Sequence, residues 1–239
     1  MTILLKKINK NCCFVILVLC LYIPRISAGD IASYVDLGFS PDGKIYMFAQ
    51  YGVQTGTLKP WADLFVVDVP QNNFVSGGRI SFVHDTPVIA GQDGSGAFFR
   101  LISRNSALAE RYEVNYLNQG HVLYLALEGN SSADAGETIE FRDFVTNSHY
   151  KAQLIPRIEG NGADITSSFH IAFEQTKIDG TKRSYTVGNP QIKRPLINSY
   201  QIRKVMVAPR DGSIVFVIEM RRQSNAGSII RYMVEALRM

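Results

Sequence analysis

The sequence predicts a mainly β protein of layered antiparallel sheets, with one α-helix near residues 97–117. Short apolar segments recur along the chain and are separated by clusters of Gly, Pro, Asn and Asp, as expected for strands and turns. Two segments, residues 45–48 and 214–218, are apolar at successive positions instead of alternating. Such a run indicates burial on both faces, as in a sheet packed between other layers.

Residues 1–28 have the three parts of an export signal. Three lysines precede an apolar stretch at residues 13–23, and Ile26 and Ala28 occupy the small-residue positions of a cleavage site. The stretch is shorter than the ~18 residues that span a bilayer, and Pro24 ends it. We therefore expect a signal peptide at residues 1–28 and a single strand-rich extracytoplasmic domain at residues 29–239, with no membrane span in the mature chain. A lipid anchor at Cys20 is the alternative.

Removal of residues 1–28 changes the net charge of the chain and removes all of its cysteines. Four of the 25 basic residues lie in it and none of the 21 acidic residues does, so residues 29–239 carry 21 of each sign. A neutral chain without basic runs has little attraction for nucleic acid. All three cysteines also lie within residues 1–28. The mature domain therefore contains no disulfide, no thiolate metal site and no cysteine nucleophile.

The first strand pair is predicted on either side of Ser40-Pro41-Asp42-Gly43. Pro41 presets the backbone for the second position of a β-turn, and Gly43 suits its end. Residues 205–218 repeat this strand-turn-strand pattern around Pro209-Arg210-Asp211-Gly212, with one inserted residue. The two units resemble the Ser-Pro-Asp-Gly repeat of TolB-like and WD40-like propeller blades, and they lie about four 40-residue steps apart. A small irregular β-propeller and another layered β fold therefore both remain open.

The other elements follow in chain order. A strand is predicted at residues 63–69, and the helix near 97–117 is predicted from an apolar stripe: Phe98, Leu101, Ile102, Leu108 and Tyr112. Further strands are predicted at residues 121–127, 138–144 and 150–155. Residues 169–177 and 182–187 flank Asp179-Gly180, which is typical of a tight hairpin. Residues 194–198 are predicted to connect two strands. Residues 228–237 are predicted to form a final strand or a short helix.

Several short sequence motifs in the first half of the chain indicate a known family. They are Gly29-Asp30-Ile31-Ala32, Tyr51-Gly52-Val53-Gln54 and Pro60-Trp61-Ala62. In their order they resemble a family of predicted secreted bacterial proteins, spirochaete members included, that is known as a domain of unknown function. The resemblance implies export and brings no activity with it.

Candidate catalytic residues are few. On the predicted strand at residues 169–174, His170 and Glu174 share one face, and a histidine held by a carboxylate could act as a general base or a metal ligand. A solvated sheet face is the competing interpretation. The four histidines show no metal-ligand spacing, so we expect no metal and no cofactor.

Trp61 is the single tryptophan and the candidate binding residue. Aromatic side chains near turns can line a recognition surface, although they also pack into the core at strand ends.

These observations favour a noncatalytic exported protein, periplasmic or secreted, that binds an envelope protein, a glycan or a small ligand through its loops. The alternative is an extracytoplasmic hydrolase with a His/Asp/Glu site assembled from separate strands, for which His170 and Glu174 are the candidates.

Overall fold

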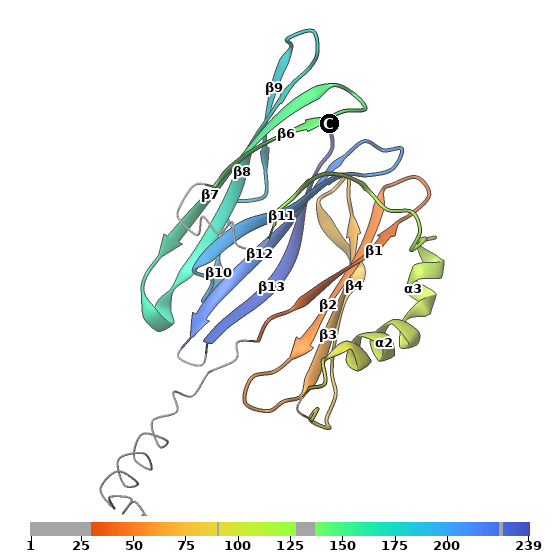
Figure 1. Cartoon of the computed structure of the whole chain (residues 1–239), viewed down its shortest axis with the longest axis vertical. Helices are drawn as coiled ribbons and strands as arrows, with labels where there is room; N and C mark the ends of the chain where they lie inside the picture. Colours follow the sequence, from red (N-terminus) through yellow and green to blue (C-terminus); the bar gives the residue numbers. More distant parts are fainter. Residues whose placement is uncertain (1–29, 90, 128–136, 225–226) are drawn as a thin grey trace, which may run out of the picture.

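In the part of the chain that the structure describes, three antiparallel sheets and a pair of helices form successive layers (Figure 1). The computed structural model describes residues 30–89, 91–127, 137–224 and 227–239, so the predicted signal peptide lies outside the described residues. The N-terminal sheet contains four strands in chain order: β1 (Ser33–Phe39), β2 (Ile45–Val53), β3 (Pro60–Asp68) and β4 (Asn73–Val83).

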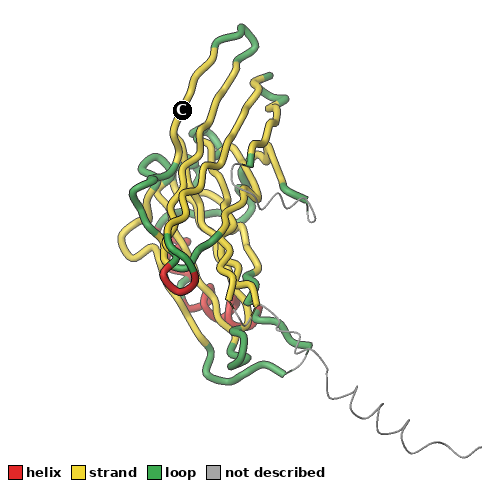
Figure 2. Tube along the Cα trace, turned by 90° about the vertical axis from the view of Figure 1, so that its left-hand side faces the viewer, coloured by secondary structure: helices red, strands yellow, loops and turns green. Residues whose placement is uncertain are grey.

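The remaining strands form two more sheets, with strands that run roughly along the long axis of the molecule (Figure 2). The central sheet has the order β13-β12-β11-β5, and its strands are β5 (His121–Leu125), β11 (Ser199–Val207), β12 (Ile214–Ser224) and β13 (Gly227–Leu237). The outer sheet has the order β10-β8-β7-β6, with β9 paired to β8. Its strands are β6 (Thr138–Asp143), β7 (Ser148–Glu159), β8 (Thr166–Thr176), β9 (Lys182–Val187) and β10 (Arg194–Pro195); a 3-10 turn, η1 (Gly162–Asp164), links β7 to β8.

The central sheet is buried on both faces. Phe216 and Ile218 of β12 belong to one apolar core, which includes Phe173 of the outer sheet. The alternate residue Val217 belongs to a second core, which includes Phe48 of the N-terminal sheet. The layered β fold is therefore confirmed, as is the predicted burial of residues 214–218 on both faces, because side chains alternate between the two cores along the strand.

Two helices, α2 (Ser95–Arg104) and α3 (Ser106–Arg111), cover the other face of the N-terminal sheet (Figure 1). The sequence predicted one helix near residues 97–117, but the helix breaks at Asn105 and ends at Arg111. Asn105 has φ −120° and ψ 21°, outside helical values. Its side-chain Nδ2 donates to the carbonyl of Leu101 at 2.8 Å, a local bond that competes with helix continuation.

The two similar turns of the sequence meet in space. Gly43, between β1 and β2, lies against the main chain of Pro209, between β11 and β12. Within the first turn, Ser40 Oγ donates to Asp42 at 2.7 Å and accepts from the Ile45 amide at 3.0 Å. The repeated pattern thus marks two turns that join the N-terminal and central sheets. The described residues form stacked sheets and no closed propeller, so the propeller alternative is not found.

The other strand predictions agree with the structure to within a few residues. β8 and β9 form the expected hairpin around Asp179-Gly180, where Gly180 has a positive φ of 82°. The last segment is a strand, β13, and not a helix. Within the part of the chain that the structure describes, no helix has both the length and the apolar character needed to cross a membrane.

Candidate functional site

His170 and Glu174 lie on β8 and face away from the core. Their neighbours Phe169, Ile171 and Phe173 are buried in the core between the outer and central sheets, so the predicted alternation is present. The two residues stand about 13 Å apart, because each residue of a strand advances the chain by about 3.3 Å. The Glu174 carboxylate instead pairs with Lys182 Nζ of β9 at 3.1 Å. The structure does not bring His170 and Glu174 together.

Glu174 lines a shallow, open depression of about 480 Å³ on the exposed face of the outer sheet. We call it the outer groove. Four strands contribute to its lining: Glu140, Phe141 and Arg142 from β6, His149, Tyr150 and Lys151 from β7, Glu174 and Thr176 from β8, and Lys182 from β9.

Charges in the outer groove are mixed. Lys151 Nζ lies 3.6 Å from Glu140, and Lys182 Nζ lies 3.1 Å from Glu174. Arg142 donates to Asn147 Oδ1 at 2.8 Å. Exposed ion pairs of this kind contribute little to folding, because solvent screens them. The groove therefore presents alternating donors and acceptors to solvent and has no strong net charge.

Two hairpin turns project from one end of the outer sheet and expose large apolar side chains. His149 of β7 pairs with Thr176 of β8, which puts the β6–β7 and β8–β9 turns at the same end (Figure 1). The exposed fractions are 79% for Phe144, 77% for Val145 and 79% for Ile178. We call these three residues the apolar tips.

Side-chain hydrogen bonds hold both turns in shape. Asp143 accepts from the Val145 amide at 2.8 Å and from Thr146 Oγ1 at 2.7 Å. Burial alone raises the pKa of Asp143, but the hydrogen bonds from Thr146 and Val145 outweigh it and the pKa is lowered. In the other turn, the hydrogen bond from the Thr181 amide lowers the pKa of Asp179. Both carboxylates therefore stay ionised at neutral pH and fix the turns that carry the apolar tips.

Trp61 lies in the interior, with 4% of its surface exposed. Its indole Nε1 donates to Asp30 Oδ1 at 3.0 Å. The Arg231 guanidinium stacks 3.9 Å from the centre of the indole ring and pairs with Asp30 Oδ2 at 2.6 Å. We call Asp30, Trp61 and Arg231 the N-terminal clamp. It ties the first described residue to β3 and β13, so the indole is engaged within the protein.

Among residues 30–89, 91–127, 137–224 and 227–239, no three His, Cys, Asp or Glu side chains are grouped so that they could hold a metal ion. Buried acids occur elsewhere, among them Glu235, and they pair with polar and basic side chains. Glu235 of β13 accepts from Asn72 Nδ2 at 2.6 Å and lies 3.6 Å from Arg194. It connects the β3–β4 turn of the N-terminal sheet with β10 of the outer sheet and is not among the residues that line the outer groove.

Sequence reasoning missed the apolar tips. The sequence predicts a strand at residues 138–144, with Phe144 as its last residue, whereas β6 ends at Asp143. The sequence does contain a signal for a turn after residue 143. Asp143 is followed by Thr146 and Asn147, and these residue types stabilise turns through side-chain hydrogen bonds to the backbone.

Comparison with known protein families identifies a match over most of the chain. The family described as predicted secreted protein, DUF2259, matches residues 47–238. No curated protein and no solved structure matches the chain. The resemblance to a family of predicted secreted proteins of unknown function is thereby confirmed, whereas the likeness to TolB-like and WD40-like repeats is not. Because the match covers most of its length, this chain belongs to the DUF2259 family of predicted secreted proteins.

Proposed function

We propose that this protein is an exported, noncatalytic binding module that engages a partner protein of the cell envelope with one end of its outer sheet. The apolar tips carry the proposal: Phe144, Val145 and Ile178 are exposed on two neighbouring turns that hydrogen bonds hold in place. Large apolar side chains grouped beside a polar surface are typical of protein interfaces.

The outer groove supports a protein partner over a lipid surface. Glu140 and Glu174 lie among its lysines and arginine, and the ion pairs leave little net charge. An anionic membrane is attracted mainly by unpaired basic residues. A protein with its own donors, acceptors and charges of both signs matches this groove better, with the apolar tips as anchors.

The hydrolase alternative has no comparable support. Glu174 is paired with Lys182, and His170 is not part of the groove lining. A general base needs its partner within hydrogen-bond distance, either directly or through one water.

The test is chemical crosslinking and affinity capture in the cells that secrete the protein. Wild type is compared with the double variant Phe144→Ser/Ile178→Ser and with Ile89→Ser, a control with 71% exposure in a loop after β4. The proposal expects a specific partner that is captured by wild type and by the control and is lost from the double variant. Equal capture by all three contradicts it, as does tip-dependent binding to anionic vesicles in place of a protein.

A further inference from the structure

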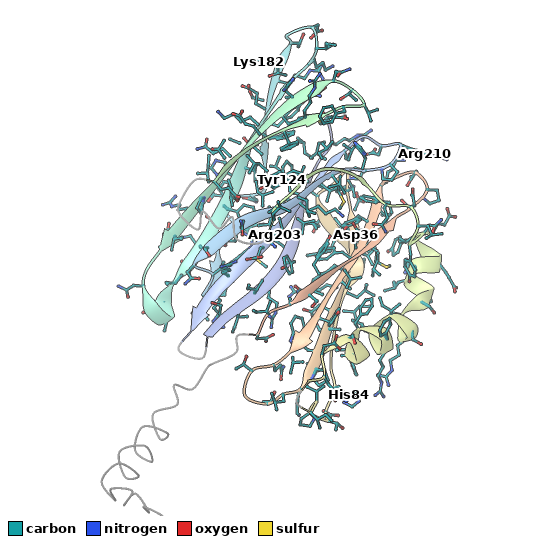
Figure 3. All side chains as sticks on the ribbon, viewed as in Figure 1. Asp36, His84, Tyr124, Lys182, Arg203 and Arg210 are labelled. Atoms are coloured by element: carbon teal, nitrogen blue, oxygen red, sulfur yellow. The ribbon has the colours of Figure 1, made fainter. Side chains whose placement is uncertain are left out.

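A second exposed cluster lies at the opposite end of the molecule from the outer groove. Figure 3 labels Lys182 of the groove near one end and His84 near the other. His84 follows β4, and its ring lies 6.2 Å from the ring of Phe82, edge to face. The neighbouring helix α2 brings two arginines to the same aromatic ring.

Arg100 and Arg104 both stack on Phe82. Each guanidinium carbon lies 5.5 Å from the centre of the Phe82 ring. The two residues are four positions apart on α2, so they lie on one face of the helix. Stacking on an aromatic face restricts the rotamers of an arginine while leaving its N–H groups exposed.

No acid neutralises this pair. Helix α2 contains no Asp or Glu. Across the described residues, neither guanidinium has a carboxylate within ion-pair distance, unlike Arg203, Arg221 and Arg231. Two like charges held against one ring repel each other, and an anion that bridges them would remove that repulsion.

We propose that Arg100, Arg104 and Phe82 form a binding site for a phosphate monoester group. Such a group carries between one and two negative charges at neutral pH and three acceptor oxygens. The planar guanidinium donates two parallel hydrogen bonds to phosphate oxygens, which a lysine cannot do. Phe82 holds both guanidiniums in place before the anion arrives. The site is independent of the protein interface proposed above.

His84 is placed to assist. Its Nδ1 is engaged with the main chain of Thr86, 3.1 Å from the amide nitrogen and 3.4 Å from the carbonyl oxygen. The imidazole therefore has its other ring nitrogen, Nε2, to offer to an anion bound beside the Phe82 ring.

Titration of the purified protein with inorganic phosphate, followed through the Nε–H NMR signals of its arginines, tests the site. We expect the Arg100 and Arg104 signals to shift together and to saturate. Arg100→Gln and Arg104→Gln should each weaken binding by about tenfold or more, the loss expected for a charged hydrogen-bond partner. Arg111→Gln is the matched control, because Arg111 also stacks on one ring, 5.4 Å from Tyr112, but has no second arginine there.

Two further variants test whether phosphate binding depends on the geometry of the guanidinium groups, on their charge alone, or on the folding of the protein. Arg100→Lys/Arg104→Lys keeps both charges and should still lose most of the binding. Phe82→Leu keeps an apolar side chain and should weaken binding without loss of the folded spectrum. Shifts that do not saturate, or an equal loss in Arg111→Gln, would overturn the site.

The source of the phosphate group is tested by competition. Displacement of inorganic phosphate by glucose 6-phosphate supports a sugar phosphate, and Arg104-dependent binding to phosphatidic acid vesicles supports a lipid headgroup. Failure of both ligands overturns the assignment to a phosphate monoester.

Discussion

Gly43 lies so close to Pro209 that a Cβ atom at residue 43 would stand 1.9 Å from the Pro209 carbonyl oxygen. This contact joins the β1–β2 turn to the β11–β12 turn, and through them the N-terminal sheet to the central sheet. Gly43 also has a positive φ of 76°. Both its backbone conformation and its position therefore require glycine.

Substitution of Gly43 by alanine should destabilise the protein far more than the same change at Gly212. Gly212 has a similar φ of 72°, but no atom lies within 4 Å of the place its Cβ would take. Gly212→Ala should cost about 1 kcal/mol from backbone strain alone. Gly43→Ala should cost about 3 kcal/mol, because the clash with Pro209 adds to the strain. Urea unfolding of both variants measures the difference; equal losses would show that the two turns do not support each other.

The N-terminal clamp should contribute strongly to stability. Asp30→Ala leaves the largely buried Arg231 and the indole N–H of Trp61 without their carboxylate, at a cost of about 2 to 3 kcal/mol. Trp61 is the only tryptophan, so its fluorescence reports the clamp directly. Glu174→Ala, which breaks an exposed ion pair, is the control and should cost less than about 1 kcal/mol. An unchanged emission spectrum in Asp30→Ala would contradict the clamp.

Glu235 should make stability depend on pH. Burial raises the pKa of Glu235, and the Asn72 hydrogen bond and the Arg194 charge only partly offset it. A carboxyl with a raised folded-state pKa contributes stability below its unfolded pKa, near 4.3, and loses it as the pH rises through the folded value. The stability advantage of wild type over Glu235→Gln should therefore shrink as the pH rises above the unfolded pKa of about 4.3.

Glu159→Gln provides a control of opposite sign. The hydrogen bond and charge of Lys193 lower the pKa of Glu159, so its contribution is present at neutral pH and is lost on acidification. Urea midpoints of wild type and both variants, measured from well below the ordinary glutamate pKa of about 4.3 up to alkaline pH, test the pair. Parallel curves for Glu235→Gln and wild type would contradict the burial of an ionisable group at residue 235.

Local patterns in the sequence predict those elements whose stability is local. The Asp179-Gly180 hairpin and the doubly buried strand at residues 214–218 were found because turn chemistry and side-chain alternation are visible over a few residues. Strand β4 was not predicted, because Gly77-Gly78 at its middle resembles a turn. In the structure, the ladder between β3 and β4 is irregular there, with a register shift between Phe65 and Val67.

Contacts between segments that are far apart in the chain could not be predicted from local sequence patterns. The two arginines on α2 are visible in the sequence, but Phe82 lies on the unpredicted β4, so nothing indicated that one ring holds both. Trp61 is the candidate binding residue of the sequence, yet its partners in the structure, Asp30 and Arg231, are far from it in the chain. In the same way, Asp42 and Asp211 suggested a repeat, and only the fold shows that their turns touch.

The most direct test of the proposed function is a photoreactive amino acid placed at a single surface position in the secreting cells. Ile178 in the apolar tips is compared with Ile89 in the loop after β4, since both are exposed isoleucines in loops. The account predicts a discrete adduct with one envelope protein from residue 178 and none from residue 89. No adduct from residue 178, or the same adducts from both positions, would contradict a binding role for this end of the outer sheet.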